Sequence, residues 1–142
     1  MNEYCFNKAI AAFEKAASLA PENLVHKENL AYCYTEHNDF SQVMKGVNLY
    51  QGILQQDSTN VKVLLRLGKL SVERTKDYPK ALSRLEKAVQ VAPNNFDANY
   101  YLAMTYEGLS RIAEAKVHYE KALALTTNQK AKDTIKEILN NL

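Results

Sequence analysis

Three stretches of the chain share one pattern of small and large apolar residues. In each stretch a small residue is followed by a large one four positions later, and by another small one three positions after that. The three sets are Ala9, Phe13 and Ala16; Ala81, Leu85 and Ala88; and Ala115, Tyr119 and Ala122. Residues at these spacings lie on one face of a helix, where the small ones let a neighbouring helix come close. The pattern therefore predicts three closely packed helices.

A second pattern recurs upstream of such helices, and it consists of a large residue, a small residue and a third residue three positions further on. The three sets are Leu30, Ala31 and Tyr34; Leu67, Gly68 and Ser71; and Leu102, Ala103 and Tyr106, led by Lys27, Leu64 and Asn99 respectively. Ala122 follows Ala88 by 34 residues, so the last helix pairs repeat with that period. A period in this range is typical of repeat architectures.

Few residues in the chain break helices, since it has four Gly and three Pro among 142 residues. The periodic segments predict helices at about 6–19, 22–37, 40–56, 61–75, 78–91, 95–109, 112–125 and 129–141, with ends uncertain by about 2–4 residues. Asn38-Asp39, Asp77 with Pro79, and Asn94-Asn95 are typical of turns and helix starts. The chain is therefore predicted to be all-α.

Together the repeated positions resemble the tetratricopeptide repeat pattern W-x2-L-G-x2-Y…A-x3-F…P, whose period is about 34 residues. The resemblance covers nearly the whole chain, although the leading position never holds Trp and the Gly position holds Gly only at Gly68. It implies a right-handed superhelix of antiparallel helix pairs, a tetratricopeptide-like α-solenoid of about eight helices.

We expect a single array over residues 1–142. Its predicted segments are the second helix of a partial first repeat (6–22), three repeats (23–60, 61–94 and 95–128) and a capping helix (129–142). The last segment has Ile135, Ile138 and Leu139 on one face and charged residues on the other, as a terminal cap requires. The alternative is the first helix of a fourth repeat. Because the array starts with half a repeat, it is left open whether the natural protein is longer.

Two of the repeats are irregular. The helix at 40–56 contains Gly46 and Gly52, and it is predicted to be longer than its counterparts by roughly one turn of about 3.6 residues. The middle repeat has one extra residue between Gly68 and Ala81, which we expect in the turn from Thr75 to Asp77.

In the tetratricopeptide family the first helix of each repeat lines a concave groove, so the positions not used for packing become candidates for binding a partner. They combine basic and hydrogen-bonding side chains with aromatic and soft apolar ones, which suits a peptide carrying acidic or carboxylate groups. The predicted groove residues are Asn29, Tyr32, Lys62, Leu65, Arg66, Lys69, Tyr100, Tyr101 and Met104.

Three of these positions resemble a more specific site. Some tetratricopeptide co-chaperones hold the acidic C-terminal tail of cytosolic heat-shock chaperones with a dicarboxylate clamp, and Asn29, Lys62 and Arg66 fall in its Asn, Lys and Arg positions. The clamp also uses a Lys and an Asn from a first helix that this chain does not include. The alternative is a general polar lining of the groove.

The charge balance argues against a nucleic-acid partner. The net charge is +2, from 18 basic and 16 acidic residues, and the charged runs are mixed rather than basic. Cys5 and Cys33 are too few for a disulfide framework and are interpreted as small packing residues. Neither a signal peptide nor an apolar run of roughly 18 residues is visible, so we expect no membrane insertion and a cytoplasmic location.

The sequence contains no recognisable catalytic set. His26, His37 and His118 lie in three different helices at no metal-ligand spacing, and the Asp and Glu residues are interpreted as caps and surface charges. His37 is expected near a helix C-terminus. We therefore expect no enzymatic activity, no cofactor and no metal.

The expected function is a scaffold that binds a peptide or protein segment in the concave groove. Two alternatives remain open. One is a chaperone-tail-binding co-chaperone domain. The other is self-association, with homo-oligomers forming through residues 6–19, whose apolar face with Phe6, Ile10 and Phe13 is expected to be exposed.

Overall fold

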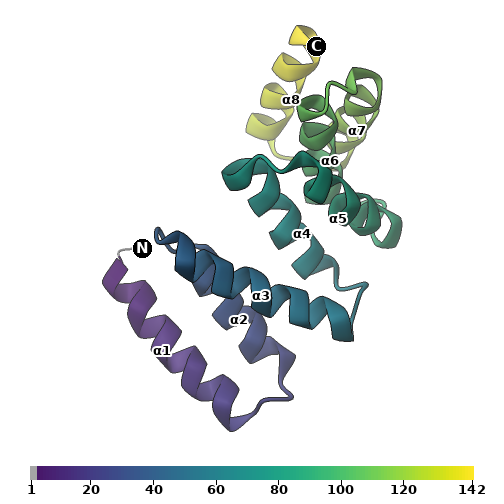
Figure 1. The fold of residues 1–142 in the computed structure, drawn as a ribbon. Helices are drawn as coiled ribbons and strands as arrows, with labels where there is room; N and C mark the ends of the chain where they lie inside the picture. The colour runs from purple at the N-terminus through teal and green to yellow at the C-terminus, as the bar shows by residue number, and fades with distance from the viewer. Residues whose placement is uncertain (1–2) are drawn as a thin grey trace. The chain divides into compact units, whose positions relative to one another are not determined.

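The computed structural model describes residues 3–142, and side chains from Phe6 onward. Within this range every regular element is a helix (Figure 1). The helices are α1 (Glu3–Leu19), α2 (Leu24–Thr35), α3 (Phe40–Gln56), α4 (Val61–Leu70), the π-helical turn η1 (Ser71–Thr75), α5 (Tyr78–Val91), α6 (Phe96–Gly108), α7 (Ile112–Leu125) and α8 (Gln129–Asn141). The all-α prediction is confirmed.

Three helices begin where the sequence indicated a cap. The side chains of Asp39, Asp77 and Asn95 each accept a backbone N–H from the first turn of the helix that follows. Asn23 and Asn128 do the same for α2 and α8. Each such bond satisfies an otherwise unpaired donor and fixes the start of the helix.

The chain divides into two compact units, residues 1–63 and residues 64–142. The division falls in the first turn of α4, inside one of the predicted repeats. The single array over 1–142, with its five segments, therefore stays a prediction.

The first unit consists of α1, α2 and α3, which pack as consecutive neighbours. Its core contains Ile10, Leu30, Cys33 and Tyr34, with Phe13 partly buried against them. The predicted exposure of Ile10 is wrong, since only 9% of its surface is accessible. The packing role of Cys33 is confirmed, whereas the side chain of Cys5 lies outside the described residues.

Gly46 brings α2 and α3 together. A Cβ atom added to Gly46 would lie 2.7 Å from the Ala31 carbonyl oxygen and 2.7 Å from Thr35 Cγ2. The backbones of α2 and α3 therefore approach too closely at Gly46 for α3 to carry a side chain there. α3 has 17 residues, against 14 in α5 and 14 in α7, but α1 also has 17, so the predicted extra length holds only relative to α5 and α7.

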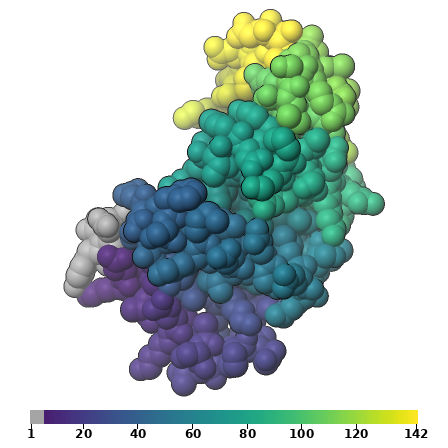
Figure 2. Space-filling model, in the orientation of Figure 1, coloured from purple at the N-terminus to yellow at the C-terminus, as the bar shows by residue number. Residues whose placement is uncertain are grey.

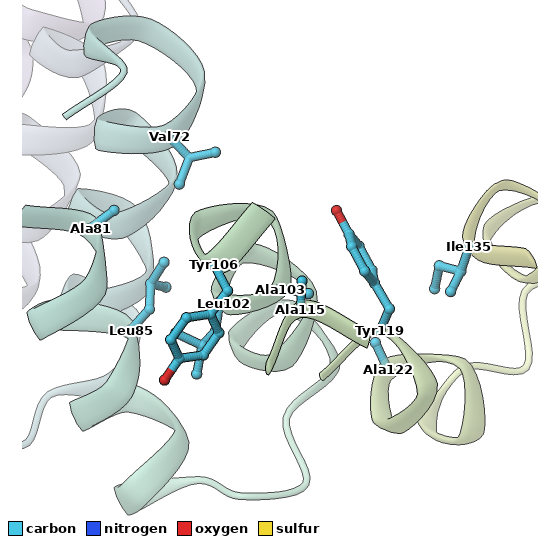
Figure 3. Close-up of a cluster of buried hydrophobic side chains, with 10 residues drawn as sticks. All are labelled: Val72, Ala81, Leu85, Leu102, Ala103, Tyr106, Ala115, Tyr119, Ala122 and Ile135. Atoms are coloured by element: carbon cyan, nitrogen blue, oxygen red, sulfur yellow. The ribbon is translucent and has the colours of Figure 1, made fainter. Parts of the chain in front are cut away.

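The second unit has a continuous core along α5, α6, α7 and α8 (Figure 3). The predicted packing positions are all buried, and Ile135 of α8 faces Tyr119 and Ala122 of α7 (Figure 3). The space-filling view also shows α8, in yellow, lying directly against α7 in green (Figure 2). The apolar face of α8 thus packs on the core, with Ile135 fully buried and Ile138 and Leu139 partly buried. The core residues are Val72, Ala81, Leu85, Leu102, Ala103, Tyr106, Ala115, Tyr119, Ala122 and Ile135.

The extra residue of the middle repeat lies earlier than predicted. It is absorbed by the wide turn η1, and the backbone N–H groups of Lys76 and Asp77 both donate to the Ser71 carbonyl. Lys76 then ends the helix in the left-handed conformation, with φ of 53°. A π-helical turn takes one residue more than an α-turn, so α5 can keep its packing positions.

Two glutamates predicted as surface charges tie helices together. Tyr34 on α2 donates to Glu14 on α1, and Tyr106 on α6 donates to Glu86 on α5 at 2.8 Å. Both pairs are 20 residues apart, so the same bond recurs in both units. Burial, together with the adjacent Glu14 carboxylate, raises the pKa of Tyr34 to about 12.

The two histidines with described roles are structural. His37 lies just after the C-terminus of α2, as expected, and its Nδ1 accepts the Asp39 backbone N–H at 3.0 Å, so the ring also holds the turn. The His118 ring stacks on Tyr106, with centroids 5.6 Å apart, and its Nδ1 lies 3.1 Å from Asn99 Oδ1.

We expect the stability of the protein to depend on pH through His118. Burial lowers its pKa, and Lys121 lowers it further, against a smaller opposing effect of Glu86. The folded state therefore favours the neutral ring, and this contribution is present above about pH 6.5 and is lost as the pH falls through the folded-state pKa. Urea unfolding between pH 5 and pH 8 should show a steeper loss of stability for the wild type than for His118→Gln.

The matched control for this measurement is Gln90→Asn, which changes an exposed residue of α5 and neither adds nor removes a titratable group. The same pH slope in the wild type and His118→Gln would contradict the assignment.

Candidate partner-binding surface

The predicted groove residues all keep accessible surface, but they belong to different units. Tyr32 and Lys62 are exposed, and the others are half-buried. Asn29, Tyr32 and Lys62 lie in the first unit, whereas Leu65, Arg66, Lys69, Tyr100, Tyr101 and Met104 lie in the second.

In the first unit, Lys62 is engaged by an internal carboxylate. Its Nζ lies 2.8 Å from Glu28 Oε2, and Asn60 Nδ2 donates to Glu28 Oε1 at 3.0 Å. Burial alone would raise the pKa of Glu28, but the bonds from Lys62 and Asn60 outweigh it and hold that pKa below its ordinary value. An acidic tail at Lys62 would have to compete with Glu28.

The three-residue clamp of Asn29, Lys62 and Arg66 accordingly stays a prediction. Arg66 belongs to the second unit, and the other two residues belong to the first.

In the second unit, a small polar cluster links α4 and η1 to α6. The Tyr101 hydroxyl donates to Glu73 Oε1 at 3.0 Å, and Lys69 Nζ lies 5.9 Å from the centre of the Tyr101 ring. Burial and the Glu73 carboxylate raise the pKa of Tyr101. These contacts fix the Tyr101 ring before any partner binds, which lowers the entropy cost of binding.

An aromatic group continues from Tyr101 along α6. Phe96 stacks on Tyr100, with ring centroids 5.7 Å apart and planes 13° from parallel. Tyr100 also makes edge-to-face contacts with Tyr101 and Tyr119, with ring centroids 5.6 and 5.9 Å apart. Tyr119 is buried, whereas Phe96, Tyr100 and Tyr101 remain partly exposed. The rings thus form a rigid, mostly apolar surface.

A cavity of about 480 Å³ lies beside these rings, within the second unit. Its volume is in the range of small-ligand and side-chain pockets. Phe96 and Tyr100 line one side, and residues of the α7–α8 connection and of α8 complete it. The lining residues are Phe96, Tyr100, Thr126, Asn128, Lys130, Ala131 and Thr134.

Sequence reasoning missed this cavity. It assigned α8 only to capping, and it did not select Phe96, which lies four residues before Tyr100 and therefore on the same helix face. That spacing was the available signal. Nothing in the sequence of α8 distinguishes a cavity wall from an exposed cap surface.

The described residues include no group of three or more His, Cys, Asp or Glu side chains that could hold a metal ion. Within the same residues, no helix is both long enough and apolar enough to cross a membrane.

Within each unit, short connections and the packing of consecutive helices are typical of a helical-repeat fold. Within it, residues 73–136 match the family model described as tetratricopeptide repeat. The chain is also 27% identical over 132 residues to cellulose synthase operon protein C of Pseudomonas fluorescens (strain SBW25), covering 91% of this chain and 10% of that protein. Residues 73–136 are therefore similar to the tetratricopeptide repeat family. The chain spans about a tenth of the length of this curated relative.

Solved structures show the same fold. A crystal structure of MamA matches with a TM-score of 0.76 and 20% identity, covering 96% of this chain and 81% of that one. A structure of MamA AMB-1 matches with a TM-score of 0.75 and 25% identity, covering 89% and 73%.

Proposed function

We propose that this chain binds a segment of a partner protein along one surface of its second unit, formed by α4 with η1, α6 and α8. The observation that carries the proposal is the half-exposed aromatic surface of Phe96, Tyr100 and Tyr101 beside an apolar cavity. Buried aromatic anchors in preformed pockets dominate the binding energy of most protein interfaces.

The surface around these rings suits a peptide of mixed character. Leu65 and Met104 are partly buried apolar residues packed on the same core, and Met adapts to different side chains. Arg66 and Lys69 add positive charge on α4. Asn29, Tyr32 and Lys62 lie in the first unit, and their contribution stays a separate prediction.

A peptide-library selection on the full chain tests this function. The selected peptides are titrated against the wild type, Arg66→Glu and Tyr101→Ala. Because a central tyrosine anchor is typically worth about 2 kcal/mol, we expect affinity to fall about tenfold or more in Tyr101→Ala.

The matched controls are Lys116→Glu and Val117→Ala, which change exposed residues of α7 outside the proposed surface. Circular dichroism should show all four variants folded. Selected peptides that bind Arg66→Glu and Tyr101→Ala as tightly as the wild type would sink the proposal.

Self-association is the weaker candidate. The face at residues 6–19 that was expected to drive it is partly used inside the first unit, where Ile10 packs on Leu30, Cys33 and Tyr34. Binding of a chaperone tail is also a less supported function, because Lys62 already forms an ion pair with Glu28.

A further inference from the structure

The cavity between α6 and α8 indicates which side chains of the partner segment bind there. This inference rests on the proposed function. We propose that the cavity takes an aromatic side chain of the partner segment, and that a carboxylate next to it in the partner's sequence pairs with Lys130.

The shape of the cavity favours an aromatic side chain. Phe96 and Tyr100 form one wall with two nearly parallel rings, and Tyr100 is held in place by its edge contacts with Tyr101 and Tyr119. On α8, Ala131 contributes only a methyl group, which leaves space that a larger residue would fill. A ring entering this space can stack or meet the edges of the wall rings, which adds to the gain from burying apolar surface.

The charges favour an acidic neighbour. Lys130 is the one charged side chain lining the cavity, and its ammonium forms none of the ion pairs among the described residues. Asp97 and Asp133 do not line it, and Asp133 accepts a hydrogen bond from Gln129 at 2.8 Å. Residues 64–142 carry 13 Lys and Arg against 9 Asp and Glu, a net charge of +4 (13 − 9). The unit therefore attracts acidic segments at long range.

Three short probes separate the two parts of the proposal in NMR titrations of the ¹⁵N-labelled full chain. They are the acetylated, amidated tripeptides Asp-Phe-Asp, Asn-Phe-Asn and Asp-Ala-Asp. Asp-Phe-Asp should shift the amide signals of Phe96, Tyr100, Lys130 and Ala131. Asn-Phe-Asn should bind about two- to fivefold more weakly than Asp-Phe-Asp, because it loses an exposed ion pair. Asp-Ala-Asp should bind at least about tenfold more weakly than Asp-Phe-Asp, because it loses the buried ring.

Variants of exposed α8 residues test the location. Thr134→Trp should fill the cavity and abolish the Phe-dependent shifts, and Lys130→Gln should remove the difference between the Asp and Asn probes. Lys136→Gln is the control, since Lys136 does not line the cavity. Equal shifts for all three probes, or shifts that survive Thr134→Trp, would overturn the inference.

The same variants keep this inference distinct from the proposed function. Library-selected peptides that lose affinity in Tyr101→Ala but keep it in Thr134→Trp would refute the cavity as the anchor site while leaving the function in place. Selected peptides insensitive to Arg66→Glu and Tyr101→Ala would refute the function itself.

Discussion

Replacing Asn99 by leucine is expected to lower the free energy of unfolding by about 2–3 kcal/mol, although the two side chains are similar in size. Asn99 is completely buried. Its Nδ2 donates to the carbonyl oxygens of Pro93 and Asn95 at 3.0 and 2.8 Å, and its Oδ1 faces His118 Nδ1 at 3.1 Å. Leucine would remove these partly buried hydrogen bonds, and a polar group away from water that loses its partner keeps its cost of desolvation.

Urea unfolding followed by circular dichroism measures this loss. Asn140→Leu is the control, because Asn140 is exposed on α8 and a surface change of this kind usually stays within about 0.5 kcal/mol. A loss for Asn99→Leu no larger than that of the control would show that the loop carbonyls do not depend on Asn99.

Adding one methyl group at Gly46 should destabilise the first unit by about 1–3 kcal/mol, whereas the same change at Gly52 should stabilise it by about 0.5–1 kcal/mol. At Gly46 the new atom would meet the backbone oxygen of Ala31, which cannot move without shifting α2. At Gly52 nothing lies within 4 Å of the new atom. Alanine there only reduces the conformational freedom of the unfolded chain.

The two glycines are six residues apart in the same helix, so each variant controls for the change in helix propensity in the other. The comparison is made by urea unfolding of Gly46→Ala and Gly52→Ala under one set of conditions. Stabilisation of both variants would contradict the close approach of α2 and α3.

The packing framework could be predicted because it depends on local spacing. The small–large–small positions Ala81, Leu85 and Ala88 are fully buried as expected, whereas Ala9, Phe13 and Ala16 of α1 are only partly buried. The position of the extra residue could not be predicted from the sequence. A loop or a wide helical turn can absorb a one-residue insertion at the same chain length. In the structure the extra residue lies in η1, where the Ser71 carbonyl accepts the backbone N–H groups of Lys76 and Asp77.

The candidate surface was predicted in part for the same reason. Positions on α6 that are not used for packing, such as Tyr100 and Tyr101, follow from helix periodicity. The contribution of Lys130 and Ala131 depends on where α8 lies after the chain reverses, which no local pattern encodes. Asn99 likewise looked like a departure from the family pattern, and its partners Pro93 and His118 are set by tertiary structure.

The recurring tyrosine–glutamate bonds give the protein an upper pH limit. Tyr34, Tyr106 and Tyr119 donate to Glu14, Glu86 and Glu107 respectively, and burial together with these carboxylates raises the pKa of each tyrosine. The stabilisation from these bonds is complete below about pH 10, where tyrosine in the unfolded chain keeps its proton, and it is lost as the pH rises through the higher folded-state values. Alkaline solution therefore acts on these helix-to-helix contacts rather than on the apolar core.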